Sequence, residues 1–179
     1  MSMAAQTNYN FGFSKGVAGG LFDLSAHEVS TRQAEGKGIT FGIGVVVGTN
    51  KGVDIKLPDA DSAGIDFEGV VVHNSVMTEL DMDNKLVIKD KRTVGCLHHG
   101  KVWVKTGENA KPAYKERVYM ITDGEEAGMF TTSEDKATKI AVNGVFLADK
   151  TTKLITASVI HIERKGCRHG LNHKPRWHC

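Results

Sequence analysis

Short apolar runs separated by turn residues dominate the chain from position 39 onward. The run 39–47 (ITFGIGVVV) is nearly continuous and predicts a buried strand, whereas 53–57 (VDIKL) alternates like a half-buried strand. Their short length and their content of β-branched and aromatic residues are typical of a sandwich or barrel. Further runs of this kind occupy residues 65–72, 86–88, 102–104, 118–121, 129–131, 139–142, 145–147 and 153–163.

The residues between these runs are turn formers. Asn143 and Gly144 separate two apolar runs and predict a two-residue hairpin, and Asp123 with Gly124 predicts another turn. Helix signals are weak, since only residues 75–84 and 111–117 have a pattern that allows a turn or two of helix. We therefore predict an all-β protein, a compact β-sandwich or β-barrel of short strands.

Residues 1–37 differ from this body because they carry few charges and much glycine. Ten of the chain's 20 glycines lie between positions 12 and 52. The segment holds more aromatic residues than a disordered tail normally does. We predict either an extended arm that lies on its own surface or a neighbour's, or an irregular cover over the protein's own core. Its apolar residues recur without a clean helical or strand period: Phe11, Phe13, Val17, Leu21, Phe22 and Leu24.

The charge distribution separates a third segment, residues 164–179. The net charge is +2, from 23 basic and 21 acidic residues, and five of the basic residues follow Glu163 with no acidic residue among them. Residues 1–163 thus carry a net charge of about −3, which argues against a body that binds nucleic-acid phosphates. The predicted organisation is an arm (1–37), a β domain (38–163) and a flexible basic tail (164–179).

The sequence lacks features that would indicate a membrane or secreted protein. No stretch approaches the roughly 20 apolar residues that cross a bilayer, and the first residues do not resemble a secretion signal. The three cysteines, Cys96, Cys167 and Cys179, are an odd number and a poor disulfide framework. We expect synthesis in a reducing cytosol and no membrane partner.

Two clusters in the body resemble chemical sites. The glycines of 42–48 (GIGVVVG) lie inside a β-branched run and not before a helix, so we interpret them as bulge or close-packing glycines of a strand and not as a phosphate loop. Cys96, His98 and His99 lack an orienting third group for nucleophilic chemistry. We interpret them as a strand end or turn with two half-exposed histidines, Cys96 and His98 sharing one face.

Other candidate ligands are weaker. Asp81 and Asp83 have the density of a calcium loop but lack its glycine and closing glutamate. In the tail, Cys167 and Cys179 with three histidines leave four alternatives: a zinc site, a disulfide loop, an appended peptide or a flexible basic tail. We assign no catalytic residue, no cofactor and no metal.

The order of motifs through residues 10–163 resembles the structural cement, or head-decoration, proteins of tailed bacteriophages. In that family a small-residue-rich arm precedes an "FG" strand, and "F-x-G-[IV]" and "G-x-[VI]-[WY]-V" strands follow. The tail after Glu163 and the Cys96–His99 segment lie outside the pattern. The matching segments are 16–23 (GVAGGLFD), 39–45 (ITFGIGV), 67–72 (FEGVVV), 100–106 (GKVWVKT), 117–120 (RVYM) and 128–130 (GMF).

This resemblance implies a non-enzymatic virion protein on the outside of a phage capsid, made in the cytoplasm of a bacterial host. Its expected partner is the major capsid protein, whose neighbouring subunits it ties together, and family members are commonly homo-oligomers, often trimers. Residues 8–30 are the candidate arm, with Phe11, Phe13, Leu21 and Phe22 as anchors. The alternatives are another virion or tail component and a small β-barrel that binds a ligand or single-stranded nucleic acid.

Overall fold

The computed structural model describes residues 16–74, 79–80, 86–134, 138–147 and 157–162. These residues contain strands and one 3₁₀ turn, η1 (Gly64–Asp66), so the predicted all-β fold is confirmed. The strands are β1 (Glu28–Ala34), β2 (Gly44–Val47), β3 (Asp54–Lys56), β4 (Phe67–Val71), β5 (Glu79–Leu80), β6 (Leu86–Val87), β7 (Thr93–Lys105), β8 (Arg117–Ile121), β9 (Phe130–Thr131), β10 (Lys139–Phe146) and β11 (Ala157–Ile162).

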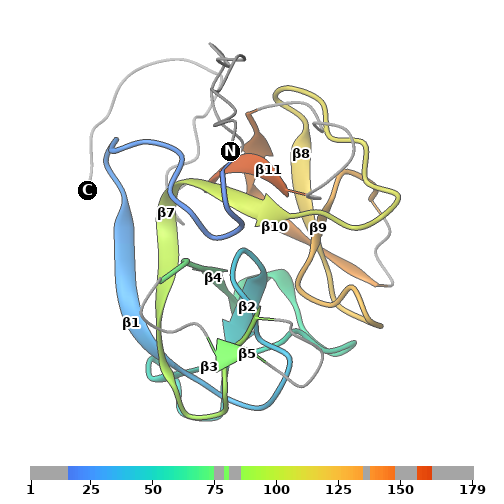
Figure 1. Cartoon of the computed structure of the whole chain (residues 1–179). Helices are drawn as coiled ribbons and strands as arrows, with labels where there is room; N and C mark the ends of the chain where they lie inside the picture. The colour runs from blue at the N-terminus through green and yellow to red at the C-terminus, as the bar shows by residue number, and fades with distance from the viewer. Residues whose placement is uncertain (1–15, 75–78, 81–85, 135–137, 148–156, 163–179) are drawn as a thin grey trace, which may run out of the picture.

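Five strands close into a barrel in the order β1-β3-β2-β4-β7, because β7 pairs back with β1. The β1–β3 pair is parallel and the other four pairs are antiparallel. Figure 1 shows these strands in the lower left of the molecule. Closure leaves no free edge among these five strands, which removes the usual template for edge-to-edge aggregation.

A second sheet grows from the C-terminal half of β7, in the order β7-β11-β10-β8-β9. It lies at the upper right in Figure 1. A parallel bridge between Thr106 and Phe130 brings β9 back to the end of β7. The change from barrel to second sheet occurs at Gly100, whose φ of +133° favours glycine and where a Cβ atom would lie 2.8 Å from the Cβ of His27. β5 and β6 form a separate two-stranded sheet.

β2 and residues 69–71 of β4 are buried on both faces, which explains their continuous apolar runs, whereas in β7 burial alternates and only Cys96 and Leu97 are buried in succession. Within each strand, consecutive residues enter different cores. Val45, Val71 and Cys96 belong to the barrel interior, whereas their neighbours Val46, Val70 and Leu97 belong to a core shared with the second sheet. That shared core also contains Met120, Phe130 and Phe146, and it joins the two parts of the fold.

The hairpin prediction at Asn143 and Gly144 is wrong. β10 runs without a turn from Lys139 to Phe146, and the two residues form a bulge between the pairs Val142–Val118 and Val145–Arg117. The strand continues because Ile140, Val142 and Phe146 all bury into the shared core on one face. A bulge absorbs the extra residues and keeps those side chains on that face.

Two other boundaries differ from the sequence analysis. β2 begins at Gly44 and not at Ile39, because Gly42 has a φ of +76° and turns the chain before the strand. Residues 111–117 form no helix; Lys115 adopts a φ of +66° there. In the other predicted helical segment, the described Glu79 and Leu80 lie in β5, and residues 75–78 and 81–84 lie outside the described residues.

The described part of residues 1–37 is built into the fold. β1 (Glu28–Ala34) is a wall strand of the barrel, although its sequence, EVSTRQA, shows no apolar alternation. Its inward side chains explain this, because Ser30 and Arg32 bond to His98 and Glu68 instead of packing as hydrocarbon. Phe11, Phe13 and the basic tail lie outside the described residues.

Candidate partner-binding surface

Residues 16–24, here called the strap, lie along the C-terminal half of β7. The amide of Gly19 donates to the carbonyl of Trp103 at 2.7 Å, and the amide of Trp103 donates back to Gly20 at 2.9 Å. Farther along, the amide of Phe22 donates to Lys101 at 3.0 Å, and Leu21 forms a bridge with Val102. The strap is therefore bonded like an additional short strand.

Glycines fix the strap at the junction of the barrel and the second sheet. Gly19 and Gly42 have φ values of +84° and +76°, and a Cβ atom on Gly42 would lie 2.7 Å from the amide nitrogen of Gly19. A Cβ on Gly16 would lie 2.0 Å from the indole nitrogen of Trp103. Such approaches leave no room for a side chain. The glycine-rich motifs of the sequence are thus close-packing positions.

The predicted anchors separate in the structure. Leu21 turns inward and packs against the shared core, whereas Phe22 remains partly exposed with its ring centroid 5.9 Å from that of Trp103. Val17 and Leu24, which the sequence analysis did not select, are the exposed apolar side chains of the strap. These aliphatic residues are isolated in a glycine-rich segment with no helical or strand periodicity, so the sequence did not predict which of them are exposed.

One ion pair fastens the far end of the strap. A carboxylate oxygen of Asp23 accepts from the ammonium of Lys101 at 2.7 Å, and the other accepts from the amide of Ser25 at 3.0 Å. The hydroxyl of Ser25 also donates to Asp23. The Lys101 hydrogen bond, followed by the Ser25 hydroxyl, lowers the pKa of Asp23 from 3.8 to about 2. The charge of Asp23 is therefore matched within the surface of the protein.

The Cys96–His99 segment is structural. Its residues lie within β7 and not at a strand end or turn. Nδ1 of His98 donates to the carbonyl of Glu68 at 2.8 Å, its Nε2 bonds to Ser30, and Glu68 accepts from Arg32 at 2.8 Å. Cys96 is buried in the barrel, and burial raises the pKa of its thiol to about 12. A thiol with that pKa is not a nucleophile at neutral pH.

The glycines of 42–48 serve packing, as predicted. Gly44 lies in β2, where a Cβ atom would lie 2.3 Å from the sulfur of Met120. Gly48 packs against the Cβ of Asp54, where an added Cβ would lie at 2.7 Å. Neither glycine precedes a helix in the described residues, so this strand does not have the geometry that cradles phosphate.

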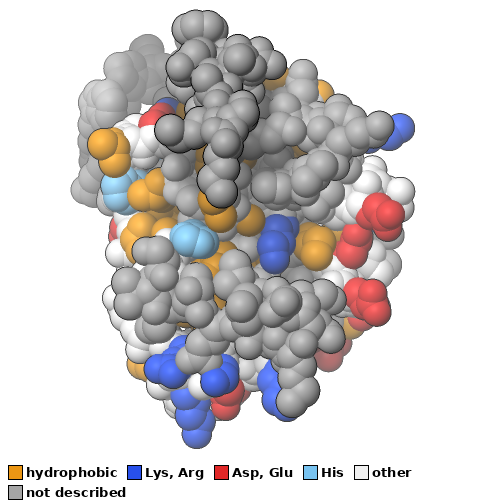
Figure 2. All heavy atoms as spheres, in the orientation of Figure 1, with side chains coloured by type: hydrophobic (Ala, Val, Ile, Leu, Met, Phe, Trp, Pro, Cys, Tyr) orange, Lys and Arg blue, Asp and Glu red, His pale blue; other side chains and the backbone are white. Residues whose placement is uncertain are grey.

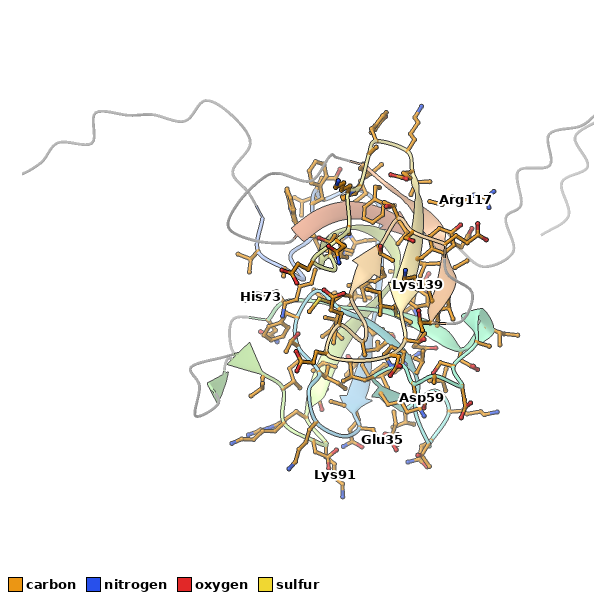
Figure 3. The ribbon with its side chains drawn as sticks, turned by 90° about the vertical axis from the view of Figure 1, so that its right-hand side faces the viewer. Glu35, Asp59, His73, Lys91, Arg117 and Lys139 are labelled. Carbon is orange, nitrogen blue, oxygen red and sulfur yellow. The ribbon has the colours of Figure 1, made fainter. Side chains whose placement is uncertain are left out.

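Two shallow grooves open on the surface that the structure describes. One, of about 430 Å³, is polar and is lined by Lys56, Asp59, Asp61 and Asp66, with Lys56 bonded to Asp59 at 2.7 Å. The other, of about 390 Å³, lies beside the β10 bulge and includes Arg117. In Figure 3, Arg117 lies on the flank opposite His73, whose amide donates to Gly19 of the strap.

Neither a metal-binding cluster nor a membrane-spanning helix is found in the residues that the structure describes. No group of three or more His, Cys, Asp or Glu side chains in the described ranges is arranged to hold a metal ion. The described residues contain no helix with the length and apolar content to span a bilayer. Asp81, Asp83, Cys167 and Cys179 lie outside those ranges.

Figure 2 shows how apolar, basic and acidic side chains are distributed on one face of the molecule. On the face shown, hydrophobic side chains gather at the upper left and around the centre, and histidines stand among them. The basic groups lie mainly toward the bottom and the acidic ones toward the right. Such a surface is suited to contact with another protein, since apolar area bordered by polar groups marks many interaction sites.

Comparison with known proteins identifies a similar fold and a family. A chain in the solved structure of the capsid of Myoviridae phage XM1 shares the fold, with a TM-score of 0.66 and 22% sequence identity. The alignment covers 91% of this chain and 99% of that one. No curated protein matches the sequence. The family model described as "Structural cement protein (E217 gp24/Pam3 gp6)" matches residues 5–163, a span that includes the strap, the barrel and the second sheet. The chain belongs to this family of phage structural cement proteins.

Proposed function

We propose that the protein binds the outer surface of a phage head and stabilises it by bridging neighbouring major capsid subunits. The family makes it a virion structural protein. Its role is to bind and not to catalyse, and it is made in the cytoplasm of the bacterial host before it attaches. The strap is the observation that carries the proposal, because it starts the amino-terminal residues from a fixed point at the surface.

Bridging follows from the arrangement of the strap and the arm. Gly16 is packed against Trp103, so the described chain starts at a fixed point on the surface. An extended segment that lies in a groove or adds a strand is a standard way for a protein to reach a second partner. Phe11 and Phe13 are the proposed anchors on that partner, while the folded body contacts the first.

Modest contacts are sufficient for such a role. When one contact is made, the second occurs at a high effective concentration, so two weak sites joined in one chain hold a seam tightly. Self-association into a homo-oligomer, such as a trimer at a symmetry axis, would multiply this effect. Packaged DNA presses the capsomers apart, and a clip across each seam raises the force at which the seam opens.

The test compares the whole chain with a form that lacks residues 1–15. The deletion stops at residue 15 because β1 begins at Glu28 and the strap is bonded to β7, so a longer one would remove structural elements. Purified heads without the protein are mixed with each form, sedimented, and then heated while DNA release is followed. Full-length protein should bind saturably and raise the release temperature, and the truncated form should fold but bind at least tenfold more weakly.

Two results would contradict the proposal. Full-length protein that does not sediment with heads excludes capsid binding altogether. Protein that binds without changing the temperature of DNA release binds the head but does not reinforce it. Replacing both Phe11 and Phe13 by serine serves as the matched control for the deletion, because it removes the anchors and keeps the length of the arm. Equal loss in both forms assigns the contact to the two rings.

A further inference from the structure

We propose that Val17, Phe22 and Leu24, here called the apolar ridge, are the surface by which the folded body docks on an uncharged apolar patch of a major capsid subunit. The inference rests on the proposed function and adds to it the face of the body that makes the contact. It assigns two residues, Val17 and Leu24, that the sequence pattern did not single out.

The exposure of the ridge is the first observation. Leu24 is 94% exposed, Val17 56% and Phe22 41%, all within eight consecutive positions of one segment. The other exposed large apolar residues of the described chain lie in separate elements: Val29 in β1, Val53 before β3, Ile65 in η1 and Tyr114 before β8. Single exposed apolar side chains are ordinary on protein surfaces, whereas a group of them indicates a contact site.

The rigidity of the ridge is the second observation. The amides of Gly19 and Phe22 donate to β7 and the carbonyl of Gly20 accepts from it, and these bonds hold the backbone between the exposed side chains. The Phe22 ring is supported by Trp103, and the Asp23–Lys101 ion pair closes the far end. A surface already fixed in its bound conformation loses little entropy on association, and this favours binding through few contacts.

Charge and chain direction identify the occupant. Asp23, the acidic residue between Phe22 and Leu24, is paired with Lys101, so the ridge brings no unmatched carboxylate into a contact. This fits an uncharged apolar patch better than an acidic or basic one. Fifteen residues precede Gly16 at the Val17 end, and Tyr9, Phe11 and Phe13 alternate among them. These rings, the proposed anchors, adjoin the ridge in sequence, so an uncharged apolar patch of the capsid suits both.

The experiment replaces Val17 and Leu24 together by serine and measures binding to heads purified without the protein. The matched control replaces Val53 and Ile65 by serine, which removes two aliphatic side chains of the same sizes from other exposed sites. Phe22 is left in place because its ring packs on Trp103. The ridge variant should bind heads at least tenfold more weakly, and the control variant should bind like the unchanged protein. Both should have unchanged unfolding transitions, since none of the four side chains is buried.

The outcomes separate the inference from the proposed function. If the unchanged protein does not bind heads, both fail. If it binds and the ridge variant binds equally well, the ridge assignment alone is overturned. If the variant keeps its affinity for heads but loses self-association in sedimentation velocity, the ridge joins copies of this chain and the inference is wrong. It is also wrong if deleting residues 1–15 increases binding of a hydrophobic dye and the ridge substitutions remove that increase, since the arm then covers the ridge.

Discussion

In the barrel, neighbouring apolar side chains of β2, β4 and β7 enter two different cores, as Val45 and Val46 do. In the strap the same residue types divide, Leu21 toward the shared core and Leu24 toward solvent. The barrel thus uses its apolar residues for folding, while the strap uses some for folding and presents the others. The difference follows from packing, because these barrel positions lie between two cores, whereas the strap packs against the shared core on one side.

Glycine shows the same contrast. In the barrel, Gly44 and Gly69 permit core side chains and strands to approach, since a Cβ at Gly69 would lie 2.3 Å from the carbonyl oxygen of Leu97. At the strap, Gly19 and Gly42 let two backbones meet where left-handed conformations are required. Close packing in the first case supports the core, and in the second it positions a surface.

The largest effect is expected from Phe130→Ala. Phe130 is fully buried in the core that joins the barrel to the second sheet, and removal of a buried aromatic ring destabilises a protein by about 3–5 kcal/mol. Leu24→Ala in the strap should change the free energy of unfolding by no more than about 0.5 kcal/mol, because its side chain is exposed. Urea unfolding measures both, and similar losses for the two variants would remove the distinction between the regions.

Much of the barrel was predictable from the sequence, because runs such as 44–47 and 70–72 are apolar at consecutive positions and strands buried on both faces require this. Its closure was not predictable, since it depends on β1 pairing with β7, with Val29 opposite Leu97. β1 itself was concealed by Ser30 and Arg32, polar residues whose partners come from distant strands. Local patterns do not report such long-range pairing.

Which side chains of the strap face outward was only partly predictable from the sequence. Phe22 was selected from its type, but Leu21 and Leu24 are alike in sequence and differ only because Leu21 bridges Val102. Local patterns also failed at Asn143 and Gly144, where the residues form a strong turn signal. There the strand continues because β10 is buried both before the bulge, at Ile140 and Val142, and after it, at Phe146. Residue type led to the prediction that the segment makes contacts, and tertiary pairing decided which side chains face outward.

An intermediate effect is expected from Gly42→Ala, which tests whether the strap depends on the glycine contact. The left-handed conformation destabilises alanine by about 1–2 kcal/mol, and the clash with Gly19 should bring the total to about 2–4 kcal/mol. Gly52→Ala is the control, because Gly52 has a φ of +81° with nothing within 4 Å of an added Cβ. Gly52→Ala should lower the free energy of unfolding only by the contribution of the left-handed conformation, about 1–2 kcal/mol. Equal losses would show that backbone conformation matters and the strap contact does not.

The smallest effect concerns the pH dependence of the strap. The pKa of Asp23 is lowered from 3.8 to about 2, chiefly by the Lys101 hydrogen bond. Because the folded-state pKa lies below the ordinary one, the pair contributes fully above pH 4 and its contribution is lost as the pH falls through 2. A carbon-detected NMR titration should place the Asp23 midpoint near 2, with the Ser25 amide shift following it.

Lys101→Met provides the control for this titration and the sharpest comparison with the barrel. Without the ammonium, the Asp23 midpoint should rise toward 3.8, while the remaining Ser25 contacts keep it somewhat lower. Global unfolding should change little, because the pair lies at the exposed end of the strap and is screened by solvent. A midpoint that stays near 2 in the variant would show that Lys101 does not hold Asp23. A large loss of global stability would show that the strap is as much a part of the folding core as the barrel wall.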